Sequence, residues 1–283
     1  MATSVRDAFR VPTALDLAAL DLAALDVRGR RTGPQSRAAA AEEMAELGPH
    51  LDGLQERLYA EGTRALLLVL QGMDTSGKGG VVRHVVGLVN PQGVHITSFK
   101  KPTEAERGEH FLARIRRRLP APGRIGVFDR SHYEDVLVVR VDELVPEEVW
   151  RSRYAEIVAF EKELVDSGVT VVKCMLHISP DEQRERLLAR LDDPTKHWKY
   201  NPADLDVRAK WSRYQDAYAE ALRRCDTEEA PWYVIPSDRK WYRNLAIGEL
   251  LLQTLQAMAP QWPVTEFDVA EQKQRLLDEK PVA

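Results

Sequence analysis

The feature that most constrains this chain is an apolar run that ends in a glycine-rich turn. Residues 65–70 read Ala-Leu-Leu-Leu-Val-Leu, and this run predicts a strand that is buried on both faces, as in a parallel sheet. Residues 72–80, Gly-Met-Asp-Thr-Ser-Gly-Lys-Gly-Gly, follow it and precede a helix-like segment over residues 81–89. A strand, a glycine-rich turn and a helix in this order predict a phosphate-binding loop; the alternative is a purely structural glycine turn.

The residue types within 72–80 suit an anion. Gly72 and Gly77 allow backbone N–H groups to crowd a phosphate, and Lys78 adds a point charge. We expect phosphate contacts from the glycines and the short hydroxyl side chains of this loop: Gly72, Thr75, Ser76, Gly77 and Gly79.

Two departures from the usual loop are informative. Gly79 stands where a Ser or Thr hydroxyl normally meets magnesium, and Asp74 places a carboxylate where phosphate oxygens are expected. A carboxylate among phosphates is repulsive unless a cation lies between them, and magnesium favours oxygen ligands. We therefore expect Asp74 to bind the metal in place of the missing hydroxyl; the alternative is that Asp74 caps the following turn.

Composition excludes several classes of protein. The 283 residues, 44% of them apolar, can form one large core, and the net charge of −4 argues against a nucleic-acid binder. Only Cys174 and Cys225 occur, which is neither a disulfide framework nor a zinc-ligand pattern and suits a reducing cytoplasm. No stretch approaches the roughly 20 apolar residues of a membrane span. We expect a soluble, cytoplasmic protein without a nucleic-acid or membrane partner.

The chain divides into three predicted parts. Residues 1–60 form an extension with a five-residue repeat within 15–26 and a long helix over 36–61, which suggests a homo-oligomer. Residues 61–262 alternate strands and helices and predict a doubly wound parallel α/β sheet, and residues 263–283 form a polar tail. The predicted strands are 65–71, 95–99, 125–128, 170–178 and 232–235, and the predicted helices of the core are 79–89, 103–119, 146–167, 180–190, 202–225 and 241–258.

Basic residues follow the second predicted strand. Ligands of doubly wound folds bind beyond the carboxyl ends of the strands, where Lys100 and Lys101 lie. An Arg-rich helix is more often a solvated face, an alternative that applies to Arg107 and Arg117 in particular. We nevertheless expect anion contacts from this basic cluster: Lys100, Lys101, Arg114, Arg117 and Arg118.

The third predicted strand leads into Asp-Arg-Ser-His-Tyr-Glu-Asp, residues 129–135. A carboxylate at such a strand end is the second acidic element of phosphoryl-transfer sites, so we expect Asp129 to hold magnesium and Arg130 to bind a phosphate with its planar fork. We expect Glu134 to orient the nucleotide or to support the metal ligands from behind; the alternative is an exposed helix carboxylate. His132 is expected to pack, because phosphoryl transfer needs charge compensation more than proton abstraction.

Residues 183–211 are dense with charge and are interrupted by Pro194 and Pro202, which predicts a helical lid rather than a core layer. Nucleotide kinases close such lids over the transferring phosphate to exclude water. Arg186 and Arg190 share one helix face and are expected to be catalytic. Nucleotide contacts are expected from three further residues, against the alternatives of a charged surface loop and a packing tryptophan: Lys196, Trp198 and Lys199.

Five blocks of this sequence resemble polyphosphate kinases of family 2, which move phosphate between inorganic polyphosphate and nucleotides. The resemblance covers roughly residues 50–262 and implies a P-loop kinase-like core with a helical lid. The blocks, in the order of that family, are residues 72–80, Lys-Lys-Pro-Thr at 100–103, Phe-Asp-Arg-Ser-His-Tyr-Glu-Asp-Val at 128–136, Arg-Leu-Asp-Asp-Pro-Thr-Lys-His-Trp-Lys at 190–199, and Ala-Pro-Trp-Tyr-Val-Ile-Pro at 230–236.

The resemblance also implies roles for single residues. Glu134 stands where other members carry Asn, which is similar to the subgroup that accepts AMP as well as ADP. A chain polyanion would also explain the basic cluster in a protein of net charge −4. The implied metal ligands for Mg²⁺, or Mn²⁺ in its place, are Asp74 and Asp129, and the implied phosphoryl-neutralising residues are Lys78, Arg130, Arg186 and Arg190.

Three hypotheses for the function remain at this point. The first is reversible, Mg²⁺-dependent phosphoryl transfer between polyphosphate and nucleotides, from AMP to ADP and from ADP to ATP. The second is an ATP-dependent nucleoside or nucleotide kinase, which the Asp-Arg-Ser step at 129–131 and the lid also suggest. The third is a sensor that binds nucleotide or polyphosphate without transfer, against which the intact Lys78 and Asp129 argue.

Overall fold

The computed structural model describes residues 4–11, 20–29 and 33–279. The first copy of the repeat, residues 15–19, lies outside these residues. The second copy contributes the 3₁₀-helix Leu22–Ala24, and Leu22 is buried in the core.

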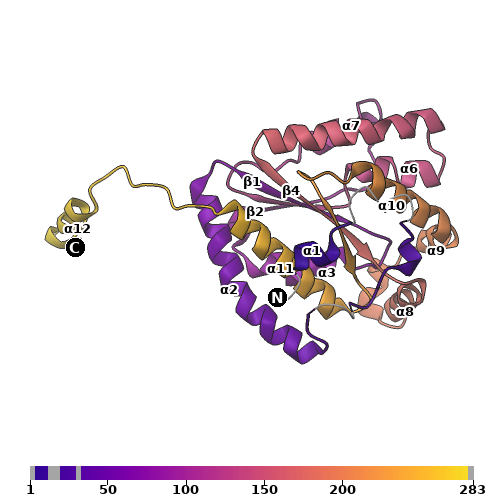
Figure 1. Ribbon diagram of the computed structural model, residues 1–283, viewed down its shortest axis with the longest axis horizontal. Coiled ribbons are helices and arrows are strands. Elements are labelled where there is room, and N and C mark those ends of the chain that lie inside the picture. The colour runs from indigo at the N-terminus through magenta and orange to yellow at the C-terminus, as the bar shows by residue number, and fades with distance from the viewer. Residues whose placement is uncertain (1–3, 12–19, 30–32, 280–283) are drawn as a thin grey trace.

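A single sheet of five parallel strands forms the centre of the molecule (Figure 1). The spatial order is β2-β3-β1-β4-β5, so β2 and β3 lie on one side of β1 and β4 and β5 lie on the other. The doubly wound parallel fold predicted from the sequence is confirmed. The strands are β1 (Ala65–Gln71), β2 (Val94–Ser98), β3 (Ile125–Asp129), β4 (Val169–His177) and β5 (Trp232–Pro236).

Helices cover both faces of the sheet because β1 is apolar on both sides. Leu66, Leu68 and Leu70 belong to the cluster that α2 (Arg37–Glu61), α3 (Lys78–His84) and α11 (Lys240–Met258) complete. Leu67 and Val69 belong to the opposite cluster, with α6 (Val138–Val141), α7 (Glu147–Asp166) and α10 (Trp211–Cys225). Figure 1 shows these two helical layers on either side of the strands.

The long N-terminal helix predicted over residues 36–61 is confirmed as α2. The Ser36 side chain accepts a hydrogen bond from the backbone N–H of Ala39 and begins the helix. Gly62 ends it in a left-handed conformation with φ of 66°, which glycine adopts without steric cost. Pro49 lies inside the helix, which continues through it.

The helix predicted over residues 103–119 is wrong as a single element. The chain forms two short helices instead, α4 (Glu104–Arg107) and α5 (Ala113–Arg116), because a capping box between Thr103 and Glu106 starts the first and Gly108 ends it. Residues 202–225 are likewise divided into α9 (Ala203–Ala209) and α10, and α3 is followed by a separate 3₁₀-helix, Val86–Leu88. The remaining elements between β1 and α11 are the 3₁₀-helices Pro91–Gly93, His132–Asp135 and Pro194–Lys199 and the helix α8 (Pro180–Leu191).

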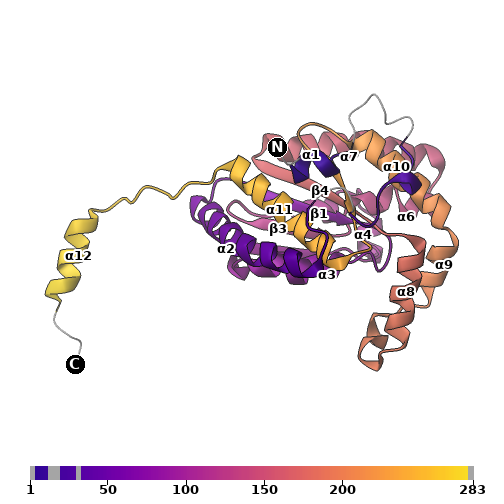
Figure 2. The same ribbon diagram turned by 60° about the horizontal axis from the view of Figure 1, so that its bottom comes forward.

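The two ends of the described chain differ in how they meet the body. The N-terminal α1 (Val5–Phe9) is followed by Arg10, which pairs with Tyr233 of β5. The C-terminal tail contains α12 (Val269–Asp278), which stands away from the body at the end of an extended segment (Figures 1 and 2). A plain polar tail was therefore an incomplete prediction. In the part of the chain that the structure describes, no helix is both long and apolar enough to cross a membrane.

Candidate active site

The carboxyl ends of β1, β3 and β2 bring the predicted site together. Leu70 of β1 is paired with Asp129 of β3, and Asp129 is paired with Ser98 of β2. The loops that follow these strands, residues 72–80, 130–135 and 99–103, therefore lie next to one another. This is the edge at which open parallel sheets bind their ligands.

Glycines give the loop of residues 72–80 its shape. Gly72 has φ of 146°, and a Cβ there would lie 2.7 Å from the carbonyl oxygen of Leu176. Gly77 has φ of 111° and caps α3. Gly79 differs, because a Cβ at this position would meet nothing within 4 Å. Packing therefore does not require a glycine at the position after the lysine.

Lys78 lies inside the loop rather than above it. Its side chain is buried, and Nζ donates hydrogen bonds to the carbonyl oxygens of Gly72 at 2.8 Å and Met73 at 3.4 Å. Burial lowers the pKa of Lys78, and the charge of Arg130 lowers it further. A nearby anion would oppose both effects, so this ammonium group is suited to binding phosphate.

Asp74 and Arg130 form an ion pair that joins the β1 loop to the β3 loop. Arg130 Nη2 lies 2.8 Å from Asp74 Oδ1, and both side chains are partly exposed. Burial opposes the charge of Arg130, but Glu134, Asp74 and Asp129 outweigh it and raise the pKa of Arg130. Arg130 also has φ of 63°, a left-handed conformation that costs a non-glycine residue roughly 1–3 kcal/mol. The backbone N–H of Arg130 donates to the Leu70 carbonyl at 3.0 Å, which holds this conformation.

Three buried oxygen atoms at this edge lack hydrogen-bond partners among the described residues: Asp129 Oδ1, Thr75 Oγ1 and Ser76 Oγ. An unpartnered carboxylate oxygen is costly to bury and suits a bound cation. No group of three or more His, Cys, Asp or Glu side chains in the described chain could hold a metal ion by itself. Phosphoryl-transfer enzymes generally use divalent metal ions, and Mg²⁺ is commonly held by one or two carboxylates plus substrate phosphates. The pair Asp74 and Asp129 fits that arrangement.

Glu134 faces the same site from the 3₁₀-helix His132–Asp135. The amide of Gln71, the last residue of β1, connects Glu134 to this strand. Gln71 Nε2 donates to Glu134 Oε1 at 3.0 Å, and the amide oxygen accepts from Ser131 Oγ at 3.0 Å. Burial raises the pKa of Glu134, and Arg130 and Lys78 act in the opposite direction. Glu134 is therefore not an exposed helix carboxylate.

A buried ionic network lies behind residues 131–135. Lys173 Nζ lies 2.5 Å from Glu161 Oε2, and it also donates to Tyr133 Oη at 3.1 Å and to the Cys225 carbonyl at 2.6 Å. Glu161 Oε1 accepts from Tyr133 Oη at 2.8 Å and lies 3.1 Å from His132 Nε2. Lys173 and Glu161 were not predicted from the sequence. A lysine within the apolar strand β4 is the feature that could have indicated a buried ion pair. His132 packs within the core, as predicted.

A basic cavity of about 370 Å³ borders the site at the end of β2. Four of the five predicted anion-binding residues line it: Lys100, Lys101, Arg114 and Arg118. Arg117 does not, because its guanidinium pairs with Glu109 at 2.7 Å on the surface. A larger cavity, about 630 Å³, is lined by Arg140, Trp150 and Arg213 and contains none of the predicted site residues.

The segment 183–211 projects from the body as α8, the 3₁₀-helix Pro194–Lys199 and α9 (Figure 2). Arg190 holds this segment together, since Nη1 donates to the Lys199 carbonyl at 2.9 Å and lies 3.6 Å from Asp204 Oδ2. Trp198 is 79% exposed, and Lys199 Nζ lies 4.9 Å from the centre of its ring. Lys196 pairs with Asp193 at 2.6 Å.

Arg186 lies where the sequence analysis did not place it. It was expected on the lid facing the phosphate, but its side chain is buried against the backbone of the loop at residues 75 and 76. The physical reason is that the first turns of α8 pack on the loop, whereas only the later turns project. Gln183 and Arg243, which the sequence analysis missed, contact the same loop.

Comparison with known proteins identifies the family that this chain matches. The family described as Polyphosphate kinase 2 (PPK2) matches residues 35–263. An AMP/ADP-polyphosphate phosphotransferase of Meiothermus ruber is 51% identical over 228 residues, which cover 81% of this chain and 85% of that protein. An ADP-polyphosphate phosphotransferase of Rhodopseudomonas palustris is 42% identical and covers 80% of this chain and 84% of that protein.

A solved structure also matches nearly the whole chain. Polyphosphate kinase 2 from Arthrobacter aurescens TC1 superposes with a TM-score of 0.93 at 45% sequence identity, and the match covers 98% of both chains. The parallel sheet, the glycine-rich loop and the acidic strand end described above lie within the matched residues. By the extent of these matches, the chain belongs to the polyphosphate kinase 2 family.

Proposed function

We propose that this enzyme catalyses reversible, Mg²⁺-dependent phosphoryl transfer between inorganic polyphosphate and nucleotides, from AMP to ADP and from ADP to ATP. One observation carries the proposal: Asp74, inside the phosphate-binding loop, pairs with Arg130 next to the unpartnered Asp129 Oδ1. Two carboxylates among phosphate-binding groups are favourable only with a cation between them and the substrate. The names of the relatives support the choice of substrates.

In this proposal each residue has a separate task. Asp74 and Asp129 hold the metal, which supplies charge compensation between the two polyanions when it is bound, and Mn²⁺ can replace Mg²⁺. Arg130 then leaves its ion pair with Asp74 and binds an oxygen of the transferred group. Lys78 exchanges a loop carbonyl for the same group, because a phosphate oxygen is the better partner for an ammonium ion.

The polyphosphate chain lies in the basic cavity at the end of β2. Lys100 and Lys101 are exposed there, and their flexible ammonium groups suit an anion that slides by one unit after each transfer. Arg114 and Arg118 line the same cavity. Arg117, paired with Glu109, has no part in this site.

The nucleotide lies between residues 130–135 and the projecting segment. Glu134 orients the nucleotide, and its carboxylate favours AMP as an acceptor in addition to ADP. Trp198, Lys196 and Lys199 close over the base and phosphates, while Arg190 reaches the transferred group from the same segment. We also propose a cytoplasmic location, which the two buried, unbridged cysteines support. We further propose a homo-oligomer, for which the long helix α2 is the support.

An assay with matched donors tests the proposal. Purified protein is incubated with Mg²⁺, AMP or ADP, and either polyphosphate or ATP as the donor, and the nucleotides are separated by anion-exchange chromatography. We expect ADP and ATP from the polyphosphate arms. Turnover with ATP and AMP alone, with none from polyphosphate, would favour the nucleoside-kinase hypothesis; binding of polyphosphate without any product would favour the sensor.

A further inference from the structure

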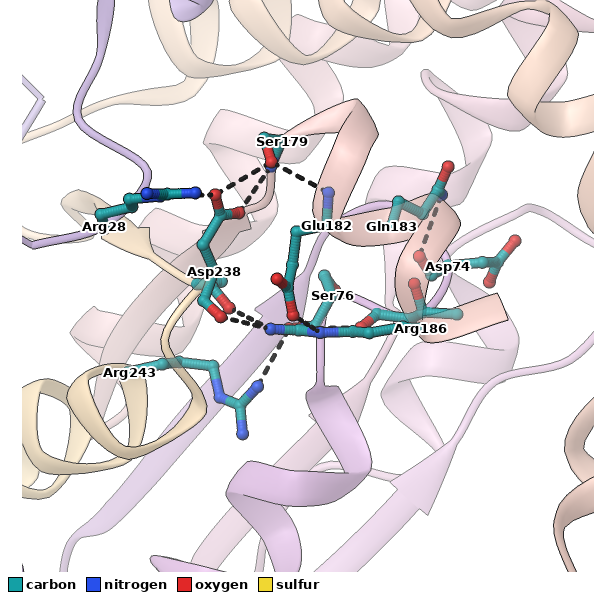
Figure 3. Close-up of polar contacts among 11 residues, drawn as sticks. Arg28, Asp74, Ser76, Ser179, Glu182, Gln183, Arg186, Asp238 and Arg243 are labelled. Carbon is teal, nitrogen blue, oxygen red and sulfur yellow. Dashed lines mark hydrogen bonds and ion pairs between the residues drawn. The ribbon is translucent and has the colours of Figure 1, made fainter. Parts of the chain in front are cut away.

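We propose that Arg186 and Arg243, together with Gln183, are positioning residues that hold the backbone of the phosphate-binding loop in its anion-binding form from the side opposite the substrate. None of the three is needed to touch substrate. The proposal depends on the proposed function only in taking residues 72–80 as the anion site. Figure 3 shows the guanidinium groups of both arginines beside Ser76 of the loop.

Helix α8 binds three successive carbonyl groups of the loop. Gln183 Nε2 donates to the Asp74 carbonyl at 3.0 Å. Arg186, one turn later on the same face, donates from Nη1 to the carbonyls of Thr75 at 2.9 Å and Ser76 at 3.2 Å. The loop is thus attached to this helix through its main chain, and sequence changes in the loop side chains would leave the attachment intact.

Arg186 has no donor left for a substrate. Its five hydrogen bonds use Nε to Glu182 at 2.7 Å, Nη1 to the loop, and Nη2 to the carbonyls of Ser237 at 2.6 Å and Asp238 at 2.9 Å. A guanidinium group carries five N–H donors in a fixed plane. Arg186 therefore joins the loop after β1 to the turn after β5 (Figure 3), which a lysine could not do with three donors on one nitrogen.

Arg243 of α11 occupies the space beneath two loop glycines. A Cβ on Gly77 would lie 1.8 Å from Arg243 Nη1, and a Cβ on Gly80 would lie 2.6 Å from Nη2. Arg243 Nη1 also donates to the Ser76 carbonyl at 3.1 Å. The side chain is buried, and Nε and Nη2 donate to the neutral amide oxygen of Asn244 at 3.2 and 2.8 Å rather than to a described carboxylate; burial and the neighbouring Arg186 lower the pKa of Arg243 to about 9. Its uncompensated positive charge favours an anion on the loop.

These contacts determine where the loop N–H groups point. In a planar trans peptide the C=O and the following N–H point in opposite directions. The Ser76 carbonyl points at both arginines, so the N–H of Gly77 points away from them, and Gly77 N–H has no hydrogen-bond partner among the described backbone groups. Thr75 has φ of 63°, a strained conformation that its flanking carbonyl contacts maintain.

The test compares Arg186→Lys with a matched control, Arg64→Lys. Arg64 is likewise bonded to a backbone carbonyl, that of Met258 at 2.7 Å, and to a carboxylate, Glu61, but it directly precedes β1, at the end of that strand opposite the loop, and no hydrogen bond or ion pair joins its side chain to the loop. Gln183→Met is the milder variant, because it nearly conserves volume and removes one contact to the loop, that to the Asp74 carbonyl, together with the hydrogen bond that Gln183 Oε1 accepts from Arg208 Nη1 at 3.0 Å outside the loop. Turnover with polyphosphate and ADP, melting temperature and amide hydrogen exchange of residues 72–77 are measured for all proteins.

We expect kcat of Arg186→Lys to fall about 10- to 100-fold, the size of effect that a misplacement of about 1 Å produces. We expect KM for ADP to change by less than about threefold, because the nucleotide contacts remain. Amide exchange should quicken at residues 72–77 and remain slow in β3, and Gln183→Met should show the same pattern with a smaller effect. Arg186→Lys should lower the melting temperature by more than Arg64→Lys, because the Arg64 side chain is 38% exposed and that of Arg186 is buried, and Arg64→Lys should keep its kcat.

Three results would overturn the proposal. The first is a kcat of Arg186→Lys within about twofold of that of Arg64→Lys, the threshold being well below the effect of misplaced reacting groups. The second is lost turnover with unchanged exchange at residues 72–77, and the third is faster exchange throughout the sheet. If the native protein shows no polyphosphate turnover, the proposed function fails by itself. The positioning role is then decided by whether tripolyphosphate protects residues 72–77 in the native protein and not in Arg186→Lys.

Discussion

Replacing Lys173 with methionine tests the buried ionic network behind residues 131–135. Lys173 is 0% exposed and Glu161 is 1% exposed, so the change removes the cation and leaves the carboxylate in the core. Methionine matches the length of the lysine chain, which limits the cavity. The substitution removes the charge together with the hydrogen bonds from Lys173 to Tyr133 Oη and the Cys225 carbonyl, so a second substitution at Glu161 is needed to separate the electrostatic part of the loss.

The expected loss follows from the burial of Glu161. Removing one partner of a buried ion pair typically costs about 3–5 kcal/mol, because the remaining charge is uncompensated. At roughly 2–4 °C per kcal/mol for a domain of comparable size, Lys173→Met should lower the melting temperature by roughly 6–20 °C. Adding Glu161→Gln should restore part of this loss, since the amide oxygen still accepts from Tyr133 and no charge remains.

The pH dependence gives an independent check. Burial opposes ionisation of Glu161, but Lys173 and His132 outweigh it and lower the pKa of Glu161 below 4.5. In the native protein this contribution to stability is present above pH 4.5 and is lost as the pH falls through the lowered pKa. Without Lys173 the pKa of Glu161 rises instead, so the variant loses stability as the pH increases above the unfolded value. The gap between variant and native protein should widen from pH 5 to pH 8.

Differential scanning calorimetry at pH 5, 6.5 and 8 measures these differences, with reversibility checked by a second scan. A gap below about 1 kcal/mol at pH 8 would refute the assignment of an ionised, buried Glu161. A gap that is constant with pH would refute it equally. So would a double variant that is no more stable than Lys173→Met, because the two residues would then not be coupled.

Four further outcomes are expected. Asp74→Asn should reduce kcat by at least about 10²-fold with little change in melting temperature, because its carboxylate is partly exposed and, among the described residues, pairs only with Arg130; near-normal turnover in a coupled ATP assay would reassign Asp74 to a structural role. Chelation with EDTA should abolish turnover, and Mg²⁺ should restore it; full activity in EDTA would exclude the two-carboxylate metal site. The dissociation constant for polyphosphate, measured by titration calorimetry, should rise steeply with added salt, and a value independent of salt would contradict an electrostatic cavity. Gly79→Ala should raise the melting temperature, because the higher helix propensity of alanine adds up to about 1 kcal/mol to the free energy of unfolding. Gly80→Ala should lower the melting temperature, because its Cβ would meet Arg243; equal shifts in a thermal melt would contradict this close contact.

The strands could be predicted to within one residue because turn residues bound them. β1 and β4 are in addition long and mostly apolar, whereas β2, Val94–Ser98, is short and partly exposed. The same pattern placed Asp74, Lys78, Asp129 and Lys100 after strands, and a parallel sheet necessarily brings its carboxyl ends to one edge. The break at Gly108 was less visible, although Thr103 and Glu106 have capping-box spacing. The many arginines of residues 103–119 suggested one continuous charged helix instead of two short ones.

Side-chain direction could not be predicted. Arg186 and Arg190 share a helix face, but the sequence does not say that the first half of α8 packs on the loop and the second half leaves the body. Lys173 shows the same limit: a lysine in the apolar strand β4 requires a partner, and nothing in the spacing identifies Glu161 on α7. Such pairings depend on which helix crosses which strand, and that is a property of the assembled layers.

The order of the strands has a consequence for substrate length. β3 separates β1 from β2, so the loop that carries Lys78 and the strand end that carries Lys100 are two strand intervals apart, roughly 10 Å. A lone orthophosphate ion is shorter than this separation of the strand ends, so both lysines could contact it only by extending their side chains toward each other. An anion of several linked phosphate units, in contrast, can reach from the end of β1 to the end of β2.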